Sequence, residues 1–188
     1  KLAPTNLDIR NTAGSAIDQV LIGNVYEGLV ARDEHNQVVP AIAKTWDVSD
    51  DGTTYTFHLN DGMTFSNGDK LDADDVAWSI NELVTKQYHD ADSLVNFVSV
   101  KASDPNTVEL KLSAPYANLL WVLTGRPGLV FDKDAKYDAK TQAIGSGPYT
   151  VEKFVTNSSI TLKANPNYWG ANKAKTDTVV VRYFTDDN

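Results

Sequence analysis

The sequence has 188 residues, 41% of them hydrophobic and 22% charged, a balance typical of a folded chain with its own core. Its 17 Lys and Arg against 25 Asp and Glu give a formal net charge of −8, which repels phosphate backbones and argues against a nucleic-acid partner. There is no cysteine, which excludes thiol nucleophiles, Cys-type zinc sites and disulfides. No apolar stretch approaches the roughly 20 residues that span a bilayer, and if the protein is exported we expect its signal or anchor segment to precede Lys1.

The first predicted element is a helix that begins at Ser15 and ends at the Gly28–Val30 stretch. Ser15 and Asp18 have the S-x-x-D spacing in which both side chains cap the start of a helix. Apolar residues follow at mostly helical spacing, so one face of the helix is expected to be buried. Beyond it we expect a short strand, a turn at residues 33–36 and a helical turn that begins at Pro40.

Hairpins are predicted in the middle and at the end of the chain. Alternating apolar and polar residues flank turn sequences such as Asp50-Asp51-Gly52, and this pattern predicts antiparallel strand pairs with one buried face. The predicted pairs cover residues 44–49 with 53–59, 96–102 with 107–112, and 149–155 with 159–164, and a last strand covers 178–184.

Further helices are predicted between the hairpins. Asp72 is a good N-cap, with Asp74 and Asp75 in the first turn, for a helix whose apolar residues form one stripe. Another helix is expected over residues 116–123, and a polar surface helix between residues 132 and 143. The predicted class is α+β, because the regular alternation of strands and helices in a doubly wound parallel sheet is missing.

No motif in the sequence marks a catalytic or metal site. The loop at residues 145–148 lacks the Lys-Ser/Thr ending of a phosphate-binding loop, and its Pro148 removes a backbone donor. His35, His58 and His89 share no metal-ligand spacing, and no G-x-S-x-G sequence surrounds a nucleophile. We therefore predict no cofactor, no metal ligand and no catalytic residue. A hydrolase with a carboxylate pair or a Ser/His/Asp set assembled in space is the alternative from another class.

Several segments, taken together and in order, resemble those of a known family. The matching segments are Tyr26–Val30, Pro40–Ala43 with Trp46, Ser49–Leu59, Gly62–Gly68, Ala73–Val76 with Ser79, Gly145–Tyr149 and Asn167–Gly170. In this order and spacing the chain resembles the extracytoplasmic solute-binding proteins of ABC importers, family 5, the oligopeptide-, dipeptide- and nickel-binding type. The resemblance covers almost the whole chain.

The resemblance implies a fold and a division of the chain. Family members have the two-lobed type II periplasmic-binding-protein fold, or Venus-flytrap fold, with a small α/β subdomain inserted into the first lobe. For this chain it implies that residues 1–43 begin lobe I, residues 44–143 form the inserted subdomain and residues 144–188 return to lobe I. We expect the second lobe to be absent from the chain, and residues 1–188 alone to bind ligand weakly or not at all.

The resemblance also implies a function. Family members bind a solute in a cleft between lobes that close by hinge motion, and deliver it to a membrane permease. The implied cargo is an oligopeptide or dipeptide, with nickel chelate or oligosaccharide as alternatives, and no enzymatic activity is implied. The implied partners are the solute and the transmembrane subunits of an ABC permease. The implied location is extracytoplasmic, in the periplasm or on the outer face of the cell membrane, with a lipid anchor outside residues 1–188.

Two places at the implied inner rim of the lobe carry candidate ligand-binding residues. Thr12, Gly14 and Ser15 form the loop before the first helix, whose free N–H groups suit a ligand carboxylate or carbonyl. Arg126 follows an apolar helix, and a guanidinium can hold a carboxylate at two points. The alternatives are a merely capped helix at the first place and a solvated loop arginine at the second.

Overall fold

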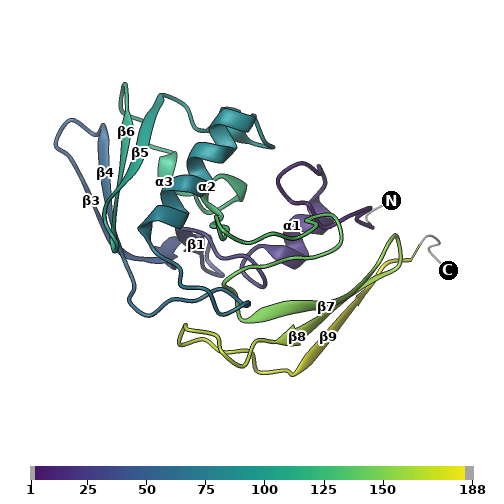
Figure 1. Cartoon of the computed structure of the whole chain (residues 1–188). Coiled ribbons are helices and arrows are strands. Elements are labelled where there is room, and N and C mark those ends of the chain that lie inside the picture. The colour runs from purple at the N-terminus through teal and green to yellow at the C-terminus, as the bar shows by residue number, and fades with distance from the viewer. Residues whose placement is uncertain (1–2, 185–188) are drawn as a thin grey trace.

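The computed structural model describes residues 3–184, whose strands form three antiparallel sheets (Figure 1). The strands are β1 (Val30–Arg32), β2 (Val38–Pro40), β3 (Ala43–Val48), β4 (Thr54–Leu59), β5 (Phe97–Asp104), β6 (Thr107–Leu112), β7 (Tyr149–Val155), β8 (Ser159–Ala164) and β9 (Thr178–Arg182). The helices are α1 (Ser15–Leu21), α2 (Ala73–Lys86) and α3 (Leu119–Val122), with single 3₁₀ turns η1 (Ala91–Ser93) and η2 (Arg126–Gly128). The sheets have the orders β1-β2, β3-β4-β6-β5 and β7-β8-β9, so the chain has the α+β class that the sequence predicts.

The four-stranded sheet and α2 form the larger of two apolar cores. In β4, Tyr55, Phe57 and Leu59 are buried and the residues between them are not, as expected for a strand with one covered face. α2 lies against this sheet and contacts β5 and β6 (Figure 1). The hairpins predicted within residues 44–59 and 96–112 are confirmed.

α2 begins where the sequence predicts. The Asp72 carboxylate accepts a hydrogen bond from the backbone N–H of Asp74 at 3.0 Å, and the Asp75 carboxylate accepts one from the backbone N–H of Asp72 at 3.0 Å. This reciprocal pair is a capping box, which satisfies N–H groups that a helix start leaves without partners. Beyond the helix, the backbone N–H of His89 donates to the Arg10 carbonyl at 2.9 Å and so joins the end of α2 to the N-terminal segment.

A second apolar core unites α1 with the three-stranded sheet. Its buried residues come from the N-terminal segment, α1, the residues that follow α1, the segment after η2, and β8: Leu7, Ile9, Ile17, Val20, Leu21, Val25, Tyr26, Leu129, Phe131, Ile160 and Leu162. In Figure 1 this sheet and the four-stranded sheet lie on different sides of the molecule. The predicted hairpin within residues 149–164 is confirmed, and the predicted last strand is present as β9.

Residues 24–29 run between the two cores and are hydrogen-bonded on both sides. The backbone N–H of Gly147 donates to the Val25 carbonyl at 3.0 Å, and that of Val130 donates to the Glu27 carbonyl at 3.1 Å. A Cβ on Gly147 would lie 2.3 Å from a backbone oxygen of this segment, so a larger residue does not fit there. The segment therefore fixes the two cores against each other.

The first helix is shorter than predicted and lacks the predicted caps. α1 ends at Leu21, and its N-cap position is Gly14, which makes no side-chain hydrogen bond. Ser15 is the first helical residue instead of the cap, so the predicted Ser15–Asp18 cap is wrong. The Asp18 carboxylate accepts a hydrogen bond from Arg126 instead, and local spacing cannot reveal so distant a partner.

Two other helical predictions differ from the structure. Pro40 lies in β2 and does not begin a helical turn, because residues 38–40 pair with residues 30–32 in antiparallel register. The helix predicted over residues 116–123 is reduced to the four residues of α3.

The polar helix predicted between residues 132 and 143 does not form. The buried Asp132 carboxylate accepts hydrogen bonds from the backbone N–H groups of Asp134 at 3.0 Å and Ala135 at 3.2 Å. Such local side-chain bonds offer the backbone an alternative to helical hydrogen bonds, and they hold this segment in a turn.

Candidate functional site

The loop of residues 8–14, called here the rim loop, leads into α1 and is held partly by its own polar side chains. The Thr12 hydroxyl donates to the Asn6 amide oxygen at 2.7 Å. Gly14 has a φ of 128°, a backbone region that favours glycine. A first hollow, of about 170 Å³, lies beside the loop and is lined by residues 3–5 and 12–17.

Arg126 is buried beneath the rim loop, with 8% of its surface exposed. Its Nε donates to the Asp18 carboxylate at 2.7 Å. Its Nη1 donates to the carbonyl oxygens of Ile9 at 2.8 Å and Thr12 at 2.7 Å. Its Nη2 makes only a 3.5 Å contact with the Gly14 carbonyl, so Nη2 is the least engaged of the guanidinium nitrogens. Arg126 therefore acts as a buried clamp on the rim loop.

The structure brings together the candidate residues Thr12, Gly14, Ser15 and Arg126. Arg126 contacts the first two through their carbonyl oxygens, and Ser15 follows them as the first residue of α1. The two alternatives drawn from the sequence differ from the structure, because α1 has no side-chain cap and Arg126 is not solvated. Contact between these four residues and a ligand stays a prediction.

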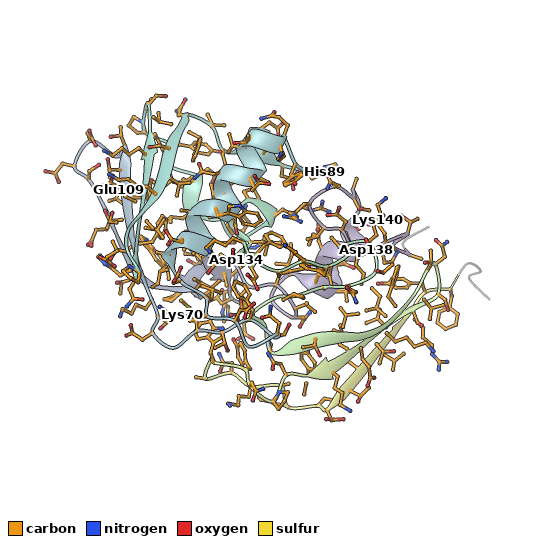
Figure 2. The ribbon with its side chains drawn as sticks, in the orientation of Figure 1. Lys70, His89, Glu109, Asp134, Asp138 and Lys140 are labelled. Carbon is orange, nitrogen blue, oxygen red and sulfur yellow. The ribbon has the colours of Figure 1, made fainter. Side chains whose placement is uncertain are left out.

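A second hollow, of about 420 Å³, lies at the other end of the rim loop and is lined by Arg10, Asn11 and residues 87–92. Figure 2 labels His89 in this region, beyond the end of α2. Gln87 and Asp90 have left-handed backbone, with φ of 53° and 66°, and so turn the chain sharply after α2. No sequence motif marks these residues, because the hollow forms only where the rim loop packs against the end of α2.

A larger groove, of about 790 Å³, lies between the β1–β2 hairpin and residues 168–172 and contains Glu27 in its wall. The Tyr168 hydroxyl donates to Oε1 of Glu27, and Oε2 is buried without a partner among the described residues. Burial raises the pKa of the Glu27 carboxyl to about 7, although the hydrogen bond from Tyr168 acts in the opposite direction. Near neutral pH this side chain is thus close to its titration midpoint.

Glu27 is expected to make the protein less stable as the pH rises from about 4.5 to about 7. The pKa of the Glu27 carboxyl is higher in the folded state than in the unfolded state. Its stabilising contribution is therefore complete below the unfolded pKa and is lost as the pH rises through the folded pKa. Glu27→Gln keeps an acceptor for Tyr168 and removes the charge. We expect the free energy of unfolding of the variant, relative to wild type, to be about 2 kcal/mol higher at about pH 8 than at about pH 5. Urea denaturation measures this difference.

Wild type and Glu27→Gln must be compared at both pH values, because Asp75 also has a pKa that burial raises. Asp75 is present in both proteins, and its contribution cancels in the difference between them. A difference that is the same at both pH values would contradict a titrating Glu27.

The histidines lie apart from one another. His58 pairs with Asp47 at 2.9 Å, outside the hollows and the groove described above, and His35 lies beside Asp33 in an exposed turn. Within residues 3–184, no group of three or more His, Asp or Glu residues could hold a metal ion. No helix in the same range is long and apolar enough to cross a membrane.

Comparisons with known proteins match nearly the whole chain. The family model for bacterial extracellular solute-binding proteins, family 5 (middle), matches residues 37–188. The glutathione-binding protein GsiB of Salmonella paratyphi A is 28% identical over 94% of the chain, and the dipeptide-binding protein of Escherichia coli is 33% identical over 77%. The crystal structure of NikA from Brucella suis in complex with Fe(III)-EDTA is 26% identical, with a TM-score of 0.84 over 99% of the chain. The chain spans 36%, 32% and 39% of the lengths of these three proteins.

Proposed function

Because the chain belongs to the family 5 bacterial extracellular solute-binding proteins, we propose that it forms the first-lobe part of the substrate-binding component of an ABC importer. The protein captures an oligopeptide or dipeptide outside the cytoplasm and delivers it unchanged to the permease. The rim loop, held by the buried Arg126 between two open hollows, carries this proposal. Polar groups that are fixed in advance beside open space suit one wall of a ligand cleft.

We further propose that residues 1–43 and 144–188 belong to lobe I and that residues 44–143 form an inserted subdomain. The two apolar cores support this division in part. One centres on α2 and the four-stranded sheet and the other unites α1 with β7–β9, but Leu129 and Phe131 of the second core come from residues 44–143. A second lobe, outside this chain, closes over the rim loop by hinge motion. The proposed location is the periplasm or the outer face of the cell membrane, with a lipid anchor outside residues 1–188.

The names of two relatives and the polar groups of the rim loop both favour a peptide cargo. Two of the relatives are named for dipeptide and glutathione binding. Thr12, Gly14 and Ser15 supply hydroxyl and backbone groups, and Arg126 supplies its Nη2 donors. These groups pair with the backbone or the carboxylate of a peptide and are indifferent to its side chains. NikA favours a metal chelate as the alternative cargo, and an oligosaccharide is the other alternative.

Titration calorimetry of the complete gene product tests the proposal with trialanine, a dipeptide pool, glutathione, nickel–histidine and maltotriose. We expect a peptide to bind with a dissociation constant of about 1 µM or lower. Mass spectrometry after incubation is expected to recover the peptide intact. Binding of only the chelate or only the sugar would identify that compound class as the cargo instead of a peptide. Cleavage of the peptide would favour the hydrolase.

The 188-residue chain is the matched comparison for this titration. Because it supplies one wall of the cleft, we expect it to bind the same peptide about 100-fold more weakly than the complete gene product. Equal affinity of the two proteins would contradict a site completed by a second lobe.

A further inference from the structure

Arg10 carries a guanidinium that is held by aromatic rings. Its Cζ lies 5.2 Å from the ring centre of Tyr88 and 4.8 Å from that of Phe131. Phe131 packs in turn on Tyr26, with 4.8 Å between ring centres, and both of these residues are buried. Cation–π contacts of this kind fix the position of a guanidinium and leave its charge in place.

Arg10 forms no ion pair with an acidic side chain of the described residues. Within residues 3–184, no carboxylate oxygen lies within 4.0 Å of its guanidinium nitrogens, and these nitrogens donate no hydrogen bond. Arg126 is the contrast, since its guanidinium is bound by the Asp18 carboxylate and by backbone carbonyls. The Nε and Nη1 donors of Arg126 serve the fold, whereas no guanidinium donor of Arg10 has a partner in the described part of the chain.

Arg10 lines the second hollow, which has room for part of a small ligand. Asp90 and Asp92 line the same hollow and add negative charge to it. A multiply charged anion is therefore disfavoured there. A group with a single carboxylate directed at Arg10, on a molecule that also carries an amine, suits this mixture of charges better.

We propose that Arg10 binds a carboxylate of the transported ligand, an inference that rests on the proposed peptide-binding function. The edge of the guanidinium donates two N–H groups to the two carboxylate oxygens. Because Tyr88 and Phe131 hold the side chain before the ligand arrives, little of its conformational freedom is lost on binding. Arg10 is thus a specificity residue for ligands with a free carboxylate.

The test compares trialanine with trialanine amide in titration calorimetry of the complete gene product. Arg10→Met keeps an unbranched apolar side chain beside the rings but removes the guanidinium with its charge and N–H donors. We expect Arg10→Met to weaken binding of trialanine about tenfold or more and to change binding of the amide less than about twofold. Arg10→Lys keeps the charge without the paired donors, so we expect it to fall between wild type and Arg10→Met.

Arg32→Met is the matched control. Arg32 also lies over an aromatic ring, at 4.7 Å from the ring centre of Trp121, but it lines the larger groove and not the second hollow. We expect it to leave both affinities unchanged. Equal losses for trialanine and its amide in Arg10→Met would show that Arg10 only packs, and no loss for either would show that it takes no part in binding.

A separate measurement distinguishes failure of this inference from failure of the proposed function. If the wild-type protein binds none of the peptides, the proposed function fails. The Arg10 Nε–Hε resonance of the ¹⁵N-labelled protein is then followed in a titration with N-acetylalanine. A saturating shift below about 50 mM supports the carboxylate site, and no shift at that concentration overturns it.

Discussion

Gly128→Ala is expected to lower the free energy of unfolding by about 4 kcal/mol or more. A Cβ on Gly128 would lie 1.8 Å from the carbonyl oxygen of Leu123 and 2.7 Å from its carbonyl carbon. Both are backbone atoms, so the whole turn from α3 to η2 must move to make room. The Gly128 carbonyl also accepts a hydrogen bond from the backbone N–H of Leu29 at 2.8 Å, and movement of the turn breaks this contact. Urea denaturation measures the loss.

Gly125→Ala is the control, because Gly125 lies in the same turn. A Cβ there would lie 3.5 Å from its nearest neighbour, an ordinary van der Waals contact. We expect its effect on the free energy of unfolding to stay below about 1 kcal/mol. Similar losses in the two variants would contradict a specific steric conflict at Gly128.

Arg126→Met is expected to lower the free energy of unfolding by about 3 kcal/mol or more. Methionine fills much of the same space but donates no hydrogen bond. The carbonyl oxygens of Ile9 and Thr12 and the carboxylate of Asp18 then lose their donors. Urea denaturation gives the size of the effect, and amide hydrogen exchange is expected to become faster first in the rim loop.

Arg32→Met serves as the control for the loss of an arginine, since Arg32 is exposed and its guanidinium lies over the Trp121 ring. We expect it to cost less than about 1 kcal/mol. A loss that small in Arg126→Met, with hydrogen exchange in the rim loop unchanged, would show that Arg126 does not hold the loop.

Local sequence patterns predict the elements that local interactions determine. The turn between β3 and β4 follows from Asp51 and Gly52: the Asp51 carboxylate accepts from the backbone N–H of Thr53 at 3.0 Å, and Gly52 has a φ of 68°. The start of α2 follows in the same way from Asp72, whose capping partners lie within a few residues. Such elements are readable because their partners are close in the chain.

Two of the predictions that are wrong involve residues with distant partners. Asp18 has the spacing of a capping residue, yet its carboxylate binds Arg126, which is 108 positions further along the chain. Asp132 lies in a segment with the polarity of a surface helix, yet its carboxylate is buried and also accepts a hydrogen bond from the Asn67 side chain at 2.8 Å. Neither contact can be found before the chain is folded.

Some residues of the candidate site could be predicted from the sequence and others could not. The family resemblance indicated both the loop before α1 and Arg126, and the structure shows them in contact. It did not indicate Arg10, because the rings that hold Arg10 come from the residues after α2 and from the segment after η2. A cation–π site assembled from three separate segments leaves no pattern in the sequence.

Arg126 contacts the rim loop through the backbone carbonyl oxygens of Ile9, Thr12 and, at a longer distance, Gly14. Every amino acid possesses such an oxygen, so substitutions at positions 11 to 13 leave the anchor intact. If the rim loop contacts the cargo as proposed, a randomised library at these positions is expected to change cargo preference while the Arg126 contacts to the backbone remain.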